Sequence, residues 1–153
     1  MIVRLIAVDR LRSPHVAALC DDLRKRLAPY HSYEEIEVRA GDGKDPRAAM
    51  RDEAARIMRH VRQDDRLWLL ERGGTELTSE ELARRLDTVR STGARRLTLV
   101  IAGAHGADPT LKVRAEFQWS LSQLTFLHEW ARALVLEQLY RAAKIARNEP
   151  YHK

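Results

Sequence analysis

Three short segments that are rich in glycine or polar residues each follow an apolar run, and together they are the part of this sequence best suited to hold a ligand. They span residues 71–75, 102–106 and 122–126. In α/β proteins, ligands collect beyond the carboxyl ends of parallel strands, where glycine lets the backbone approach them closely. We therefore expect one pocket built from these loops. The spacing of Gly103 and Gly106 is also common in scaffold loops, so by itself it indicates function only weakly.

Other kinds of catalytic site find little support in the residue types. The six histidines are scattered and the single cysteine, Cys20, has no partner, so we expect no metal site. No Ser-His-Asp arrangement can be defended from the order of residues. Cys20 falls in a helical pattern, which favours a small core residue in a reducing compartment.

The elements that must position the loops alternate between strands and helices. Apolar or alternating runs predict strands at residues 2–8, 33–38, 67–70, 97–101 and 118–121, the second at a sheet edge. Helical spacing and capping signals predict helices at residues 14–27, 46–62, 79–92, 109–117 and 129–147. Leu19 and Met58 are expected to face the core. The chain should therefore be one α/β domain, residues 1–153, with a mainly parallel sheet and helices on both faces.

The chain is mildly basic. It holds 27 lysines and arginines against 22 acidic residues, a net charge of +5 without a polybasic tail. That balance tolerates a polyanionic partner but does not require one. No apolar window approaches the roughly 18 residues of a membrane span, and Arg4, Asp9 and Arg10 interrupt any signal-peptide pattern. We expect a cytoplasmic protein without a membrane partner.

Several motifs in the last third of the chain resemble a known family. They are Ile101-Ala-Gly-Ala-His-Gly106, Trp119-Ser-Leu-Ser-Gln-Leu-Thr-Phe126, His128, Arg132, Glu137-Gln-Leu-Tyr-Arg-Ala142 and Pro150-Tyr-His-Lys153. With these motifs, its length and its first strand, the chain resembles the RlmH family. Members of that family are SPOUT-class methyltransferases that methylate N3 of a pseudouridine in bacterial 23S ribosomal RNA.

The resemblance implies a fold, a cofactor and partners. It implies a C-terminal trefoil knot that binds S-adenosylmethionine, a homodimer, and 23S ribosomal RNA within the ribosome as substrate. By position, the residues implied to bind the cofactor are Leu70, Ala102, Gly103, Leu121, Ser122, Gln123, Leu124, Thr125 and Phe126. Two positions depart from the family pattern, which usually has glycine in place of Ala102 and proline in place of Leu127.

Methylation of N3 requires that the ring lose a proton and that the resulting negative charge be stabilised. Candidates for positioning the substrate are His128, Arg132, Arg141, Tyr151, His152 and Lys153. The arginines and the lysine could stabilise the charge, whereas Tyr151 and His152 could stack on the base or hydrogen-bond to it. His128 could be a base, a helix cap or a satisfied polar residue, and the residue pattern alone favours the last two. The residue types leave the proton acceptor unassigned.

Alternative functions remain open from the sequence. The chain could be a non-catalytic RNA- or ribosome-binding module on the same fold, with Ala102 and Leu127 marking a decayed cofactor loop. It could also be a methyltransferase with a different RNA target. Trp130 lies at the edge of the polar face of the last helix, where it could contact a second copy or an RNA base, and we favour the second copy.

Overall fold

One parallel sheet organises the chain, and the computed structural model describes residues 1–42 and 45–150 of it. The five strands are β1 (Ile2–Val8), β2 (Ser32–Val38), β3 (Arg66–Glu76), β4 (Arg96–Ile101) and β5 (Phe117–Ser120). They lie in the order β2-β1-β4-β3-β5, and every neighbouring pair is parallel. The α/β fold with a parallel sheet is thus confirmed, and β2 lies at an edge as predicted.

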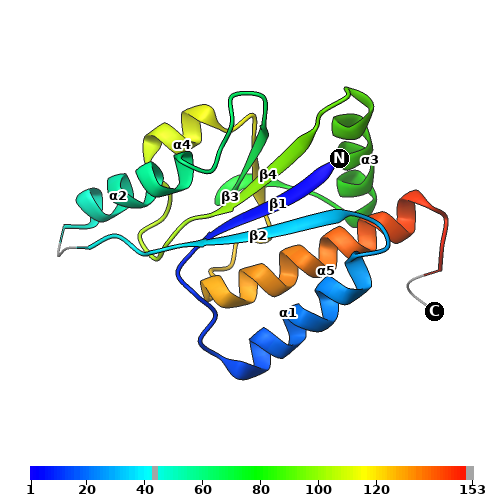
Figure 1. Ribbon diagram of the computed structural model, residues 1–153, viewed down its shortest axis with the longest axis horizontal. Helices are drawn as coiled ribbons and strands as arrows, with labels where there is room; N and C mark the ends of the chain where they lie inside the picture. Colours follow the sequence, from blue (N-terminus) through cyan, green and yellow to red (C-terminus); the bar gives the residue numbers. More distant parts are fainter. Residues whose placement is uncertain (43–44, 151–153) are drawn as a thin grey trace.

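Helices cover both faces of this sheet, which confirms the predicted layers (Figure 1). One face is packed by α1 (Pro14–Leu27), α3 (Ser79–Ser91) and α5 (His128–Ala146), whose apolar side chains share a core with alternate residues of β1 and β4. The other face is packed by α2 (Pro46–Met58) and α4 (Pro109–Arg114), through a smaller core that includes Ile57 and Leu111. Strands buried on both faces explain the continuous apolar runs in the sequence.

Side-chain caps begin four of the helices, in agreement with the predicted starts. Ser13, Asp45 and Asp108 each accept a hydrogen bond from a first-turn N–H group, and a proline follows each of them. At α3, Thr78 and Glu81 form both bonds of a capping box. These side chains satisfy N–H groups that a helix start would otherwise leave unpaired.

Four details differ from the sequence-based expectations. Helix α4 ends at Arg114, three residues before the predicted end, and Phe117 begins β5. The segment 71–75, expected to be a loop, continues β3 and pairs again with β5 after a register shift between Leu70 and Thr75. Gly74 allows this close pairing, because a Cβ atom there would lie 2.4 Å from the Gln118 carbonyl oxygen. Helix α2 ends at Met58, four residues before the predicted end. Leu19 and Met58, expected in the core, are 46% and 36% exposed because each lies at the rim of its helix's apolar stripe.

A buried arginine joins the start of α5 to the sheet. The side chain of Arg132 is 0% exposed. Its Nη1 atom donates to Glu37 at 2.5 Å and to Glu35 at 3.2 Å, and its Nη2 atom donates to the carbonyl oxygen of Asp9. Glu35 also accepts from Arg24 of α1 at 2.9 Å. The polar face of edge strand β2 is therefore neutralised by two arginines from the helix layer.

We expect Arg132→Met to lower the free energy of unfolding by about 3 kcal/mol, because the buried network around Glu35 and Glu37 would lose its cation. Urea denaturation followed by circular dichroism measures this change. Arg26→Met is the matched control, since Arg26 pairs with Asp22 at the surface with both side chains more than half exposed. The control should change stability by no more than about 0.5 kcal/mol. Equal effects of the two substitutions would contradict a structural role for Arg132.

Candidate functional site

A cavity of about 560 Å³ opens where the middle of β3 meets the carboxyl ends of β4 and β5. Its walls come from residues 70–72 at the register shift of β3, from the β4 loop (residues 102–107), from the β5 loop (residues 121–127) and from the first turn of α5. The three segments expected to form a pocket thus meet in one place. The volume lies within the range of about 300–1,000 Å³ that is usual for small-molecule sites.

Most of the residues expected to bind a cofactor lie on the cavity wall. Those that line it are Leu70, Ala102, Gly103, Leu121, Ser122, Leu124, Thr125 and Phe126. Gln123 is the one expected residue that does not line the cavity. The wall is mainly apolar side chain and loop backbone, which suits a ligand with a flat heterocycle and a few polar edges.

Hydrogen bonds join the β5 side of the cavity to the bulged part of β3. Ser120 donates from its hydroxyl to the carbonyl oxygen of Arg72 at 2.9 Å. Arg72 in turn donates from Nη1 to the hydroxyl of Thr125 at 3.2 Å. Inside the β5 loop, the N–H of Leu124 donates to the hydroxyl of Ser122 at 3.1 Å. The β5 loop is therefore held against the bulged part of β3, and the predicted loop at 71–75 contributes to the site as strand.

The β4 loop keeps its shape without strain at Ala102. Gly106 has a φ of +86°, a left-handed conformation that favours glycine, and its N–H donates to the Gly103 carbonyl oxygen at 3.0 Å. Ala102 is not among the described residues with a positive φ. The alanine at this position is thus compatible with an open cavity.

Gly103 lacks a side chain for a reason that the sequence pattern did not reveal. A Cβ atom there would lie 2.6 Å and 2.7 Å from the two carboxylate oxygens of Glu53 on α2. The carboxylate, rather than the cavity, occupies that space. Glu53 was not expected at the site, because its position in an amphipathic helix gives no signal of contact with a distant loop.

His128 is the one substrate-positioning candidate on the cavity wall among the described residues. It opens α5, whose N-cap residue Leu127 supplies no side-chain hydrogen bond to the first turn. The Nε2 atom of His128 is buried and has no hydrogen-bond partner within residues 1–42 and 45–150. A ligand in the cavity would therefore meet an imidazole and a helix N-terminus at the same rim.

The other candidates lie elsewhere. Arg132 is fully buried in its network with Glu35 and Glu37, a placement that does not fit the direct substrate contact expected from the sequence. Arg141 lies three turns along α5, where its guanidinium pairs with Glu137 at 2.5 Å. The remaining candidates, Tyr151, His152 and Lys153, fall outside the described residues.

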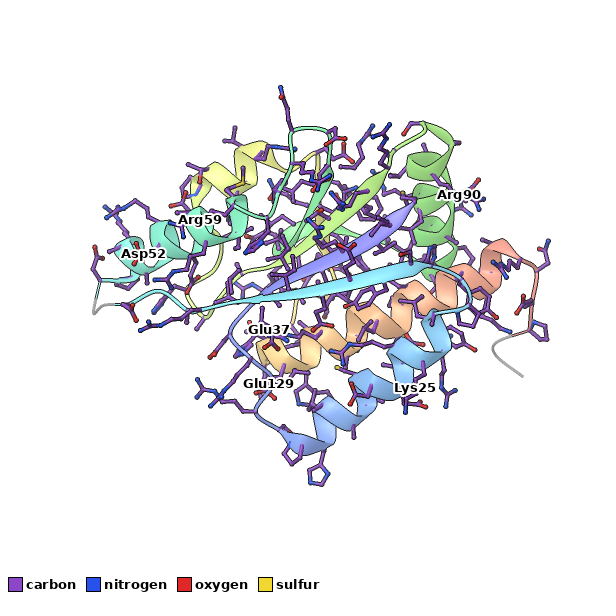
Figure 2. The ribbon with its side chains drawn as sticks, in the orientation of Figure 1. Lys25, Glu37, Asp52, Arg59, Arg90 and Glu129 are labelled. Atoms are coloured by element: carbon purple, nitrogen blue, oxygen red, sulfur yellow. The ribbon has the colours of Figure 1, made fainter. Side chains whose placement is uncertain are left out.

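The carboxylate of Glu129, labelled in Figure 2, joins the first turn of α5 to the β1–α1 connection. Glu129 accepts hydrogen bonds from the backbone N–H groups of Arg12 at 2.8 Å and Ser13 at 3.0 Å. These bonds hold the pKa of Glu129 below its ordinary value. Asp9 accepts from the N–H of Arg10, which lowers its pKa in the same way. The β1–α1 connection is thus fixed to the first turn of α5.

Residues 1–42 and 45–150 contain no group of three or more histidine, cysteine, aspartate or glutamate side chains placed to hold a metal ion. Over the same residues, none of the helices is both long and apolar enough to cross a membrane.

Comparisons with known proteins point to one family. A family model described as "Predicted SPOUT methyltransferase" matches residues 1–152. A ribosomal RNA large subunit methyltransferase H from Gloeobacter violaceus is 38% identical over 152 residues, 99% of each chain. A protein of the same name from Rubrobacter xylanophilus is 40% identical, and the match covers 97% of this chain and 96% of the relative. Another from Acetivibrio thermocellus is 35% identical over the whole length of both chains.

The lowered pKa of Glu129 predicts a pH-dependent contribution to stability. Since the folded pKa is below the ordinary value of about 4.3, the stabilisation is complete above that value and is lost as the pH falls through the folded pKa. Glu129→Gln should therefore lower the melting temperature at pH 7 and lower it less near pH 3. Asp22→Asn, at an exposed position on α1, should change it little at either pH. An equal loss from Glu129→Gln at both values would contradict this account.

Proposed function

We propose that the protein transfers a methyl group from S-adenosylmethionine to ribosomal RNA, because the chain belongs to the SPOUT methyltransferase family. The observation that carries the proposal is the cavity where the middle of β3 meets the ends of β4 and β5, with loop backbone and apolar side chains on its walls. We propose as cofactor-binding residues those expected from the sequence, except Gln123. The family also implies a trefoil knot in the C-terminal region.

The cavity fits the cofactor in size and in the chemistry of its walls. Leu70, Leu121 and Phe126 offer apolar surface for an adenine ring, and the backbone of the β4 and β5 loops offers polar groups for its edges. When bound, S-adenosylmethionine supplies a methyl group activated by a positively charged sulfur. The chain's own task is then to align the acceptor atom with that methyl group, which can supply most of the rate.

The substrate proposal rests on the relatives, which are named as large-subunit ribosomal RNA methyltransferases. We propose N3 of a pseudouridine in 23S ribosomal RNA, on the assembled ribosome in the cytoplasm. The ring nitrogen must lose its proton, and a cation beside the ring would stabilise the negative charge. Arg141 and Lys153 are the candidates for that cation, since Arg132 is buried. His128, Tyr151 and His152 are the candidates for contact with the base.

Calorimetry and a methyl-transfer assay test this function. We expect one S-adenosylmethionine bound per chain, and label transferred to 50S or 70S ribosomes that lack the modification. Nuclease digestion and mass spectrometry should identify 3-methylpseudouridine. Phe126→Ala should weaken cofactor binding about tenfold, because it removes an aromatic side chain from the cavity wall. Leu19→Ala, at an exposed position on α1 that does not line the cavity, should leave cofactor binding unchanged. A folded protein that binds ribosomes but not the cofactor would instead support a non-catalytic RNA-binding module.

Exposed apolar side chains lie on the cavity wall and on the nearby first turn of α5. Leu124, Leu127 and Trp130 are 71%, 72% and 53% exposed, and Phe126 beside them is 39% exposed. An exposed cluster of large apolar side chains marks an interaction site more often than a solvated surface. We propose that a second copy of the chain covers this patch in a twofold-symmetric homodimer.

Light scattering at micromolar concentration should give about twice the 17.6 kDa mass of one chain. The double substitution Leu127→Glu with Trp130→Glu should produce a monomer, because it places charge in the proposed contact. Leu19→Glu, at an exposed leucine on α1, should leave the mass unchanged. A wild-type monomer would contradict the proposed dimer.

A further inference from the structure

A buried carboxylate lies directly behind the β4 loop of the cavity. Glu53 of α2 is only 4% exposed. Its Oε1 atom accepts a hydrogen bond from the N–H of Gly41 at 3.0 Å. Its Oε2 atom is buried and has no hydrogen-bond partner among the residues that the structure describes. Glu53 does not line the cavity itself, so any effect on a ligand passes through its neighbours.

The neighbour that matters is Gly103, which does line the cavity. Its Cα faces the Glu53 carboxylate so closely that a Cβ atom would lie 2.6 Å from Oε1, 2.7 Å from Oε2 and 2.9 Å from the carboxyl carbon. A side chain at position 103 would therefore require the carboxylate of Glu53 to move. The carboxylate is thus packed directly against the Cα atom of Gly103.

The burial of this carboxylate is costly and needs an explanation. A buried oxygen without a partner loses its hydration and gains nothing in return. None of the ion pairs within residues 1–42 and 45–150 involves Glu53, although Asp52 beside it pairs with Arg56 at 3.8 Å. A solvated position on α2 would satisfy Glu53 better. What its buried position provides is a rigid contact between the β2–α2 connection, through Gly41, and the β4 loop, through Gly103.

We propose that Glu53 is a positioning residue that sets the conformation of the β4 loop and, through it, the affinity of the cavity for S-adenosylmethionine. Its carboxylate accepts a hydrogen bond from the N–H of Gly41 and packs directly against the Cα atom of Gly103. The loop in front of it closes on the bond from the Gly106 N–H to the Gly103 carbonyl oxygen. The effect on affinity rests on the proposed cofactor, whereas the effect on the loop does not.

Hydrogen exchange of the cofactor-free protein tests directly whether the contact of Glu53 with Gly103 supports the β4 loop. Glu53→Ala should speed amide exchange in a peptide covering residues 102–107 at least tenfold, because the loop loses its support. Glu53→Gln keeps the size of the side chain and an acceptor for Gly41, so the exchange rates of this peptide should stay close to those of the wild-type protein. Asp52→Asn is the matched control: this carboxylate is adjacent in sequence but lies on the exposed side of α2 (Figure 2), and its loss should leave the peptide unchanged.

Calorimetry with S-adenosylmethionine tests the consequence. Glu53→Ala and Gly103→Ala should each weaken binding at least tenfold, and Glu53→Gln should stay within threefold of wild type. Adding Glu53→Ala to the Gly103→Ala variant should weaken the affinity by less than a further threefold. The methyl group added at position 103 would then occupy the space left by the Glu53 carboxylate. If Glu53 only stabilised the fold, Glu53→Ala would lower the melting temperature, but its effect on affinity would not depend on the residue at position 103. If Glu53→Ala does not fold, Glu53→Asp, which is shorter by one methylene, takes its place in the cycle.

The outcomes separate the two proposals. Unchanged exchange at residues 102–107 in Glu53→Ala would overturn the positioning role, as would losses of affinity that simply multiply in the double variant. A tenfold loss in Glu53→Gln would also overturn it, because the contact would then act through charge and not through size. Failure of the wild-type protein to bind S-adenosylmethionine would instead overturn the proposed function, and the exchange experiment would still decide whether Glu53 shapes the loop.

Discussion

The structure depends on how it handles one buried positive charge. The guanidinium of Arg132 is out of contact with water and is neutralised by carboxylates of β2 and by the carbonyl oxygen of Asp9. A charge removed from water is tolerated only when it is paired and hydrogen-bonded. The pairing requires the first turn of α5 to lie against the ends of β1 and β2. That turn also carries His128, so the same constraint places the imidazole at the rim of the cavity.

The site itself is an arrangement of backbone more than of reactive side chains. Parallel strands end at one edge, and their loops meet there because the sheet order brings β4 and β5 to either side of β3. Hydrogen bonds from Ser120 and Arg72 close one wall, and the carboxylate of Glu53 supports the other from behind. Such a pocket is suited to hold a reactive cofactor in one orientation, so that catalysis depends on alignment.

Local signals in the sequence were sufficient for most of the fold. The strands, the helix starts at Ser13, Asp45 and Asp108, and the edge position of β2 all follow from short-range chemistry. The end of β3 did not follow, because Gly73 and Gly74 have the composition of a turn, and only the approach of β5 makes them strand.

The candidate site was harder to predict where it depends on contacts between distant residues. The cavity walls were found from strand ends and from the family resemblance. Arg132, however, looked like a free cation, because the carboxylates that bury it lie about 95 positions earlier in the chain. Glu53 gave no signal for a similar reason, since its contact with Gly103 joins two helix–strand units. Both are decided by tertiary packing, which residue types and spacing do not encode.

The bonds between α5 and the start of the chain also determine the order in which the molecule can be completed during synthesis. Arg132 contacts Asp9 across 123 positions of sequence, and Glu129 contacts Arg12 across 117. Contacts of such long range close late, because the loop entropy between them is lost before they form. While the chain is still growing, Glu37 lacks its cation and Glu35 has only that of Arg24, and the cavity lacks its last wall. The cavity is therefore incomplete until α5 has been made.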